Sequence, residues 1–322
     1  MKFLVIGIAV FLGFDSPCYS WGFYAHKQIN QLAVFALPSE MFSFYKRNIN
    51  YLSEHAVDPD KRRYLVKGED IKHYIDIDLY ERAIPLDTIP FTYKEAVEKY
   101  GKDSLHANGI VPWNIQWKLH ELSAAFASRN ELLILKISAE LGHYIADAHV
   151  PLHTTSNYNG QQTNQQGIHG FFETRLPELF MQQYDFFIAP ATYIYHPLQF
   201  TWDAVSGSYA CLDSVFFYEH LVQTETKASL KYVFEPRGAT LVKVYSPSLS
   251  EKYHHYLKGM VERRMRAAVF AVSCFWYTAW VNGGQPNLED LRNKNLPMID
   301  SLNQELSGDL PHPKMIGRQE ND

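Results

Sequence analysis

Cysteine is scarce in this sequence. The 322 residues include three cysteines, Cys18, Cys211 and Cys274, too few for a small secreted fold held together by disulfides. Cys18 lies in the apolar N-terminal segment. The other two either form one disulfide or remain as buried thiols, because each lies in an apolar stretch. A disulfide-rich scaffold is therefore excluded.

Positive charge is scarce as well. Thirty Lys and Arg residues stand against 35 Asp and Glu residues, so the formal net charge is −5. Proteins that hold nucleic acid on a broad surface carry a basic footprint, and none is present here. The length and a hydrophobic fraction of 46% suit a globular protein that buries a sizeable core. No repeat or linker divides the chain into separate domains.

Long hydrophobic runs are nearly absent, and the first one has a recognisable form. Residues 1–20, MKFLVIGIAVFLGFDSPCYS, contain a lysine, an apolar run, and small residues three and one positions before Trp21. This pattern predicts a signal peptide cleaved before Trp21, with a retained anchor as the alternative. The apolar run is shorter than the roughly 20 residues that span a bilayer. We therefore expect a secreted or periplasmic protein without stable membrane insertion.

Apolar residues at three- and four-residue steps predict an all-α, single multi-helix domain over residues 21–307. The helices are expected at 26–38, 39–56, 112–129, 130–149, 167–184, 201–228 and 248–281. The last one contains the run AAVFAVSCFWYTAW, which is apolar on all sides and predicts the central core helix. Only 230–247 has a strand-like composition and predicts a small β-hairpin. The polar tail, residues 308–322, is expected to be disordered.

The stretch GHYIADAHVPLH, residues 142–153, concentrates potential metal ligands. On a helix, His143 and Asp147 share one face, whereas His149 points elsewhere. Pro151 disfavours helix before it, so His153 is expected on a turn from which it can fold back toward Asp147.

The stretch GIHGFFETR repeats this device, because His169 and Glu173 are also four residues apart. Either His/carboxylate pair alone could be a hydrogen bond on a helix surface. Two pairs and a further histidine within a short span instead favour a zinc site, since zinc binds imidazole nitrogen and carboxylate oxygen. The upstream candidates are His26, Asp58 and His73. Spacing alone cannot separate them from the rivals His55, Asp70, Asp76 and Asp78.

This ordered set of residues resembles the superfamily of zinc-dependent phospholipase C and the secreted single-strand-specific zinc nucleases. The resemblance spans residues 21 to about 175 and implies a mostly helical fold with three zinc ions at the bottom of a cleft. It implies that Asp58, His73 and His143 hold the first ion and that Asp147 bridges it to the second. It further implies that the second ion is completed by Trp21, through its free α-amine and carbonyl, and by His26. The third ion would be held by His153, His169 and Glu173.

The chemistry implied by the resemblance is phosphate ester hydrolysis. Three carboxylates neutralise only half of the charge of three zinc ions, so the site would attract an anionic phosphate. Asp147 and Asp58 would be the catalytic carboxylates. They would hold the metals whose shared water becomes a hydroxide that attacks phosphorus. Because Trp21 would bind through its α-amine, removal of the signal peptide would be required.

The sequence leaves the substrate open. Glu173 resembles the phospholipase branch, since the nucleases usually have Asp there. The short spacing from Trp21 to His26, and Tyr24 in place of an acid, resemble the nucleases. Tyr74 could stack on a base, line a head-group pocket or pack in the core. The other candidate substrate-binding residues are Asp76, Lys61 and Arg62, although the run DKRR could equally be a solvated face.

Three functions are compatible with these residues. The first is a secreted, monomeric zinc phosphodiesterase of the phospholipase C type, acting on phospholipid head groups. The alternative is a single-strand-specific nuclease (3′-nucleotidase or endonuclease) that uses the same three zinc ions on single-stranded nucleic acid. The third is a catalytically idle binding protein in which zinc only stabilises the fold, with closed metal coordination.

Overall fold

The computed structural model describes residues 22–80, 86, 88–237, 240–289 and 291. The expected signal peptide (1–20), Trp21 and the expected disordered tail (308–322) lie outside the described residues.

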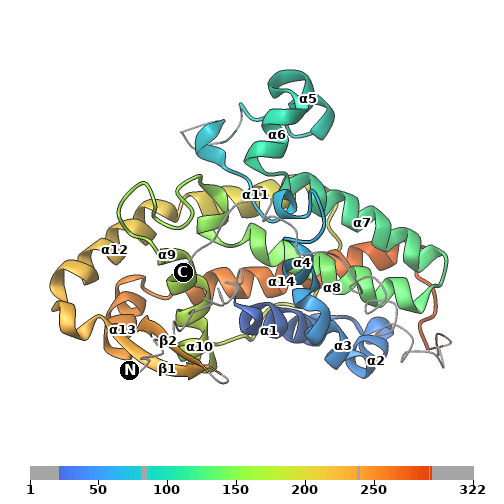
Figure 1. Ribbon diagram of the computed structural model, residues 1–322. Coiled ribbons are helices and arrows are strands. Elements are labelled where there is room, and N and C mark those ends of the chain that lie inside the picture. Colours follow the sequence, from blue (N-terminus) through green and yellow to red (C-terminus); the bar gives the residue numbers. More distant parts are fainter. Residues whose placement is uncertain (1–21, 81–85, 87, 238–239, 290, 292–322) are drawn as a thin grey trace, which may run out of the picture.

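The described chain is a single helical domain with one two-stranded sheet (Figure 1), which confirms the predicted all-α class. The α-helices are α1 (Phe23–Ala33), α2 (Ser39–Arg47), α3 (Ile49–Glu54), α4 (Asp58–Arg62), α5 (Tyr93–Tyr100), α6 (Lys102–Asn108), α7 (Val111–Ala127), α8 (Glu131–Ala148), α9 (Ile168–Gly170), α10 (Leu176–Phe180), α11 (Pro197–Tyr209), α12 (Leu212–Glu225), α13 (Pro247–Tyr256) and α14 (Met260–Asn282). Short 3-10 helices include η2 (His55–Val57), η3 (Asp70–Lys72) and η5 (Pro151–Thr154), and a π-helix, η6 (Phe171–Arg175), follows α9.

The sheet is the predicted hairpin. Strands β1 (Tyr232–Arg237) and β2 (Thr240–Tyr245) are antiparallel, with Tyr232 opposite Tyr245. Arg175, at the end of η6, links the hairpin to the helices through hydrogen bonds. Its Nη atoms donate to both carboxylate oxygens of Glu235 at 2.8 and 2.7 Å, and its Nε donates to the Tyr245 carbonyl at 3.0 Å.

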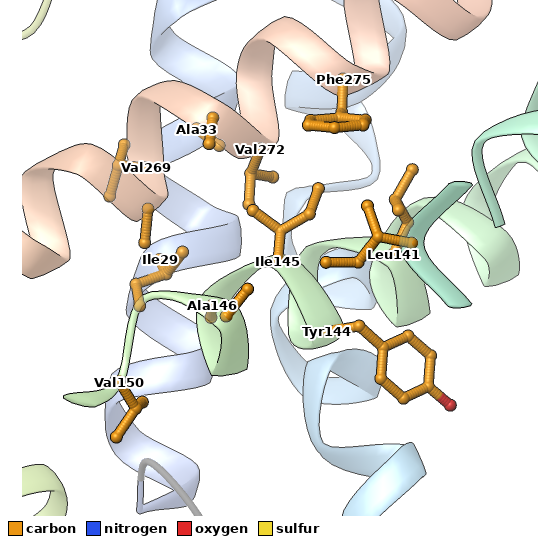
Figure 2. Packing of buried hydrophobic residues seen from close by; sticks show 14 of the residues in the cluster. Ile29, Ala33, Leu141, Tyr144, Ile145, Ala146, Val150, Val269, Val272 and Phe275 are labelled. Carbon is orange, nitrogen blue, oxygen red and sulfur yellow. The ribbon is translucent and has the colours of Figure 1, made fainter. Parts of the chain in front are cut away.

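Helix α14 runs through the centre of the molecule beside α8 and α1 (Figure 1), as expected for a helix that is apolar on all sides. Figure 2 shows Ile145 of α8 and Val272 of α14 pointing toward each other, with Ile29 of α1 close by. All three side chains are fully buried. No described helix is long and apolar enough to cross a membrane.

Several predicted helices are divided in the structure. The predicted helix 248–281 breaks between α13 and α14, where Lys258 and Gly259 both have positive φ. The predicted helix 201–228 ends at Tyr209 and restarts at Leu212. The predicted helix 167–184 is a succession of α, π, α and 3-10 turns. Apolar spacing alone does not reveal such breaks, because the same face continues across them.

The two remaining cysteines form no disulfide. Cys274 of α14 is buried, and its sulfur accepts a hydrogen bond from the Thr192 backbone N–H at 3.3 Å. Cys211 is partly buried before α12, and its thiol donates to the Gly207 carbonyl at 3.2 Å. Both cysteines are therefore free thiols, the second of the two possibilities that the sequence left open.

Candidate metal centre

Three groups of His, Asp and Glu side chains lie close enough together to hold metal ions in the described part of the chain. Within each group, one candidate ligand atom per residue lies within 4.8 Å of the others. The groups are His26–Asp60–His143, His73–His143–Asp147 and His153–His169–Glu173. Every member is at most 3% exposed.

The close crossing of α1 and α8 assembles the first group. A Cβ on Gly142 would lie 2.0 Å from the side-chain oxygen of Asn30, so only glycine allows this approach. The amide of Asn30 donates to the carbonyls of Leu52 and Ala139, each at 3.1 Å. One turn before Asn30 on α1, the ring of His26 stacks on that of His143, with ring centroids 4.0 Å apart.

Helix α8 presents His143 and Asp147 on one face, as their spacing predicts. Nε2 of His143 lies 3.1 Å from Oδ2 of Asp147 and 2.9 Å from Nδ1 of His73. The same Asp147 oxygen lies 2.9 Å from Nδ1 of His73. Because every residue from 137 to 148 is buried, these contacts are shielded from solvent.

The third group forms where η5 meets α9 and η6. Nε2 of His169 lies 2.9 Å from one oxygen of Glu173, and Nε2 of His153 lies 3.4 Å from the other. Glu173 lies on the π-helix η6, a local widening that is frequent at functional sites. His153 also connects this group to the second one, because its Nδ1 lies 3.7 Å from Oδ1 of Asp147.

Three of these histidines are oriented by backbone carbonyls. The Nδ1–H groups of His143, His153 and His169 donate to the carbonyls of Ala56, His73 and Tyr158, at 2.8, 2.7 and 3.2 Å respectively. Such a hydrogen bond fixes the tautomer, so that Nε2 carries a lone pair toward the centre of the group. This arrangement is typical of histidines that ligate metals.

His26 and His73 provide a test of whether a metal fits. Nδ1 of His26 and Nε2 of His73 have no hydrogen-bond partner among the described residues. Buried polar atoms without partners destabilise a fold, and a metal ion would satisfy these lone pairs. The residues present therefore suit metal binding.

The protonation states also suit metal binding, which needs neutral imidazoles and ionised carboxylates. Burial lowers the pKa of His26, and the nearby His143 adds to this effect. Burial also lowers the pKa of His73 to about 3, although Asp147 opposes the shift. Burial alone would raise the pKa of Asp147, but His143 and His153 hold that pKa well below its usual range.

Asp58 does not lie in the cluster, contrary to the sequence expectation. Its carboxylate contacts Nδ1 of His55 at 2.5 Å and Nζ of Lys61 at 2.8 Å, and its side chain is 24% exposed. Asp60 takes the expected place, with Oδ1 3.5 Å from Nε2 of His143 and 3.6 Å from Nδ1 of His73. Residues two apart on a helix point about 200° apart. Only one of the two carboxylates can therefore face α8.

The expected phosphate-binding cations are engaged elsewhere. Lys61 pairs with Asp58, and Arg62 pairs with Glu140 at 2.8 Å and with Glu69 at 3.0 Å. The next residue, Arg63, was not predicted. It is 2% exposed, and its charge contributes to the lowered pKa of His73. A helical reading of DPDKRR would have placed Asp60 and Arg63, three residues apart, on one face.

Three further candidate residues follow His73 along the chain. The Tyr74 ring is buried, with its hydroxyl 3.4 Å from the Ala107 carbonyl, so the structure places it in the core. Asp76 is also buried. Burial raises the pKa of Tyr80, and the negative charge of Asp76 contributes to this shift. Asp78, a rival ligand, accepts hydrogen bonds from the backbone and hydroxyl of Ser156.

Trp21 lies outside the described residues. The first described residue, Gly22, contacts Thr174, the neighbour of Glu173. A Cβ on Gly22 would lie 2.8 Å from the Thr174 side chain. The start of the described chain therefore lies next to the element that carries Glu173.

Comparisons with known proteins give only a distant likeness. No family model matches the chain, and no curated protein matches it. Among solved structures, the chain is similar to the alpha-toxin of Clostridium perfringens avian strain SWCP, with a TM-score of 0.43 and 11% identity over 82% of this chain. It is also similar to the alpha-toxin of Clostridium absonum, with a TM-score of 0.42 and 12% identity over 84% of this chain. The matched region covers 65% of each of those proteins.

Proposed function

We propose that this protein is a zinc-dependent hydrolase of phosphoric esters, a secreted phosphodiesterase of the phospholipase C type. The observation that carries the proposal is the position of the Asp147 carboxylate between His26 on one side and His73 and His143 on the other. Oδ1 of Asp147 lies 3.4 Å from Nε2 of His26, while Oδ2 faces His73 and His143. A carboxylate with one oxygen toward each group is suited to bridge two ions.

The proposed ligands are His26, Asp60, His73, His143, Asp147, His153, His169 and Glu173, with the α-amine and carbonyl of Trp21 after cleavage of residues 1–20. Zinc bound there would supply a water of lowered pKa and neutralise charge on the phosphate. Within this set, Asp60 takes the role that the resemblance implied for Asp58.

With zinc bound, the site would be electropositive and would favour an anionic substrate. Three carboxylates, Asp60, Asp147 and Glu173, leave half of the charge of three zinc ions unneutralised. Arg63 adds a buried guanidinium near His73. A phosphodiester anion is therefore attracted to this site although the whole chain has a net charge of −5.

Phospholipid is the first proposed substrate class, because Glu173 resembles the phospholipase branch. Single-stranded nucleic acid is the second, because the spacing of Trp21 and His26 resembles the nucleases. The burial of Tyr74 does not support its use as a base-stacking platform.

The test uses protein that begins at Trp21, stripped of metal by a chelator and reloaded with zinc. Hydrolysis of bis-p-nitrophenyl phosphate should appear only in the loaded protein. Parallel assays on phosphatidylcholine vesicles and single-stranded DNA then separate the two substrate classes. Absence of hydrolysis on all three substrates, in protein shown to contain zinc, would leave the idle zinc-binding protein as the better description.

A further inference from the structure

Helix α8 ends between two proposed metal ligands. Asp147 lies in its last turn, and His153 follows on η5 after the helix has ended. His153 therefore approaches Asp147 from just beyond the end of α8, and Oδ1 of Asp147 lies 3.7 Å from Nδ1 of His153.

The carbonyls at the end of this helix are all satisfied, although a helix leaves its last four without intrahelical partners. Two are satisfied by the chain as it turns away. The Ala146 carbonyl accepts from His149 N–H and the Asp147 carbonyl from Val150 N–H, each at 2.9 Å. The Ile145 carbonyl accepts a further bond from Nδ1 of His149 at 2.7 Å. This bond turns the His149 ring back along the helix.

The next two carbonyls are satisfied by other helices. The hydroxyl of Ser208 on α11 donates to the Ala148 carbonyl at 2.7 Å. Nε of Arg264 on α14 donates to the His149 carbonyl at 2.9 Å. Arg264 also donates through Nη2 to the Ser208 hydroxyl and to the Ala204 carbonyl, the latter at 2.9 Å. We call this pair, Arg264 and Ser208, the α8 cap.

The cap is tightly packed and remains charged. A Cβ on Gly207 would lie 3.0 Å from Nη1 of Arg264, so the backbone of α11 lies directly against the guanidinium. Burial lowers the pKa of Arg264 to about 10, which leaves it protonated at neutral pH. No described carboxylate pairs with it. The charge instead faces the C-terminus of α8, where the helix dipole favours a cation.

We infer that Arg264 and Ser208 are positioning residues of the metal centre, which hold the α8–η5 junction so that His153 reaches the group completed by His169 and Glu173. This inference rests on the proposed function, because it assumes that this group binds metal. Neither residue contacts a proposed ligand side chain in the described structure. Each acts through the backbone carbonyls between Asp147 and His153.

The test measures metal affinity rather than activity. Metal-free protein beginning at Trp21 is titrated with Co²⁺, and the visible absorption reports the ligands around each ion. Arg264→Met and Ser208→Ala should weaken cobalt binding at the group formed by His153, His169 and Glu173 by about 10- to 100-fold, as changes behind metal ligands commonly do. Arg264→Lys, which keeps the charge and one donor, should lose less. Arg266→Met is the matched control, since Arg266 lies on the same helix, 36% exposed, and donates to the Phe187 carbonyl.

A second set of variants, made in protein that carries His153→Ala, distinguishes an effect on the position of His153 from an effect on overall stability. If the cap acts through His153, Arg264→Met should change cobalt affinity no further in protein that already carries His153→Ala. An equal loss in both backgrounds would overturn the inference, as would urea unfolding of the metal-free variants that shows lower stability with unchanged cobalt affinity. If the unaltered protein bound no cobalt, the proposed function itself would be refuted, and this inference with it.

Discussion

The side-chain oxygen of Asn30 occupies the space that a β-carbon on residue 142 would need, with a separation of only 2.0 Å. This contact joins α1 to α8 immediately beside the stacked rings of His26 and His143. A single glycine thus permits the helix crossing that brings two proposed ligands together.

Gly142→Ala should therefore lower the free energy of unfolding by about 1–3 kcal/mol, the usual cost of overpacking a core. It should also weaken metal binding, because α1 must move away from α8. Urea unfolding and cobalt titration would measure the two effects. In protein carrying Asn30→Ala the clash is relieved, so the two changes should be less than additive. Full additivity would show that the contact with Asn30 is not the cause.

Asp147→Asn should abolish phosphodiesterase turnover and lower the zinc content. A neutral amide would no longer offset the repulsion between the cations that Asp147 is proposed to hold. His149→Gln is the control, since His149 bonds to the Ile145 carbonyl and lies off the ligand face. It should keep the full metal complement. Metal analysis that finds unchanged zinc and normal turnover in Asp147→Asn would refute the bridging role.

Asp60→Asn and Asp58→Asn form a second matched pair. Asp60 faces His73 and His143, so its change should reduce metal affinity by at least about tenfold. Asp58 is partly exposed and contacts His55 and Lys61, so its change should cost no more than about 1 kcal/mol of stability. Zinc competition with a chromophoric chelator would measure both affinities. A larger loss of zinc affinity in Asp58→Asn than in Asp60→Asn would show that Asp58 is the ligand.

Glu69→Gln should lower the stability of metal-free protein at pH 7 by about 3 kcal/mol. Burial opposes ionisation of Glu69, but Arg62 and the hydrogen-bond donors Lys72 and Tyr144 outweigh it and lower its pKa to about 2. Because the folded pKa lies below the unfolded one, this stabilisation is complete above pH 4.5 and disappears as the pH falls toward 2. The difference in urea unfolding between variant and native protein should shrink over that range. The exposed Glu98→Gln should show no such dependence.

Extension of the chain upstream of Trp21 should remove one proposed metal ligand, because a peptide bond replaces the free α-amine. Protein that begins at Trp21 and protein with one additional N-terminal residue should differ in zinc affinity and in turnover. The two forms should have similar circular dichroism spectra, since the described helices begin at Phe23. Equal affinity and activity would show that the α-amine of Trp21 is not a ligand.

Features that depend on near neighbours along the chain could be predicted from the sequence. Helical periodicity indicated the helical class and the central helix α14, and four-residue spacing paired His143 with Asp147 and His169 with Glu173. The prediction from Pro151 that the helix ends before His153 is confirmed, because α8 ends at Ala148. These are local effects of backbone geometry, and the same physics acts on an isolated segment.

Residues that are equivalent in local pattern are distinguished only by the packing of the folded chain. Asp58 and Asp60 both lie on α4, but only Asp60 lies near His143, because one face of that short helix packs on α8. In the same way, Arg62 forms ion pairs with Glu69 and Glu140, whereas the side chain of Arg63 is buried. Contacts of this kind join segments that are far apart in sequence. The balance between burial and charge at each position therefore depends on the packed fold, which local spacing does not encode.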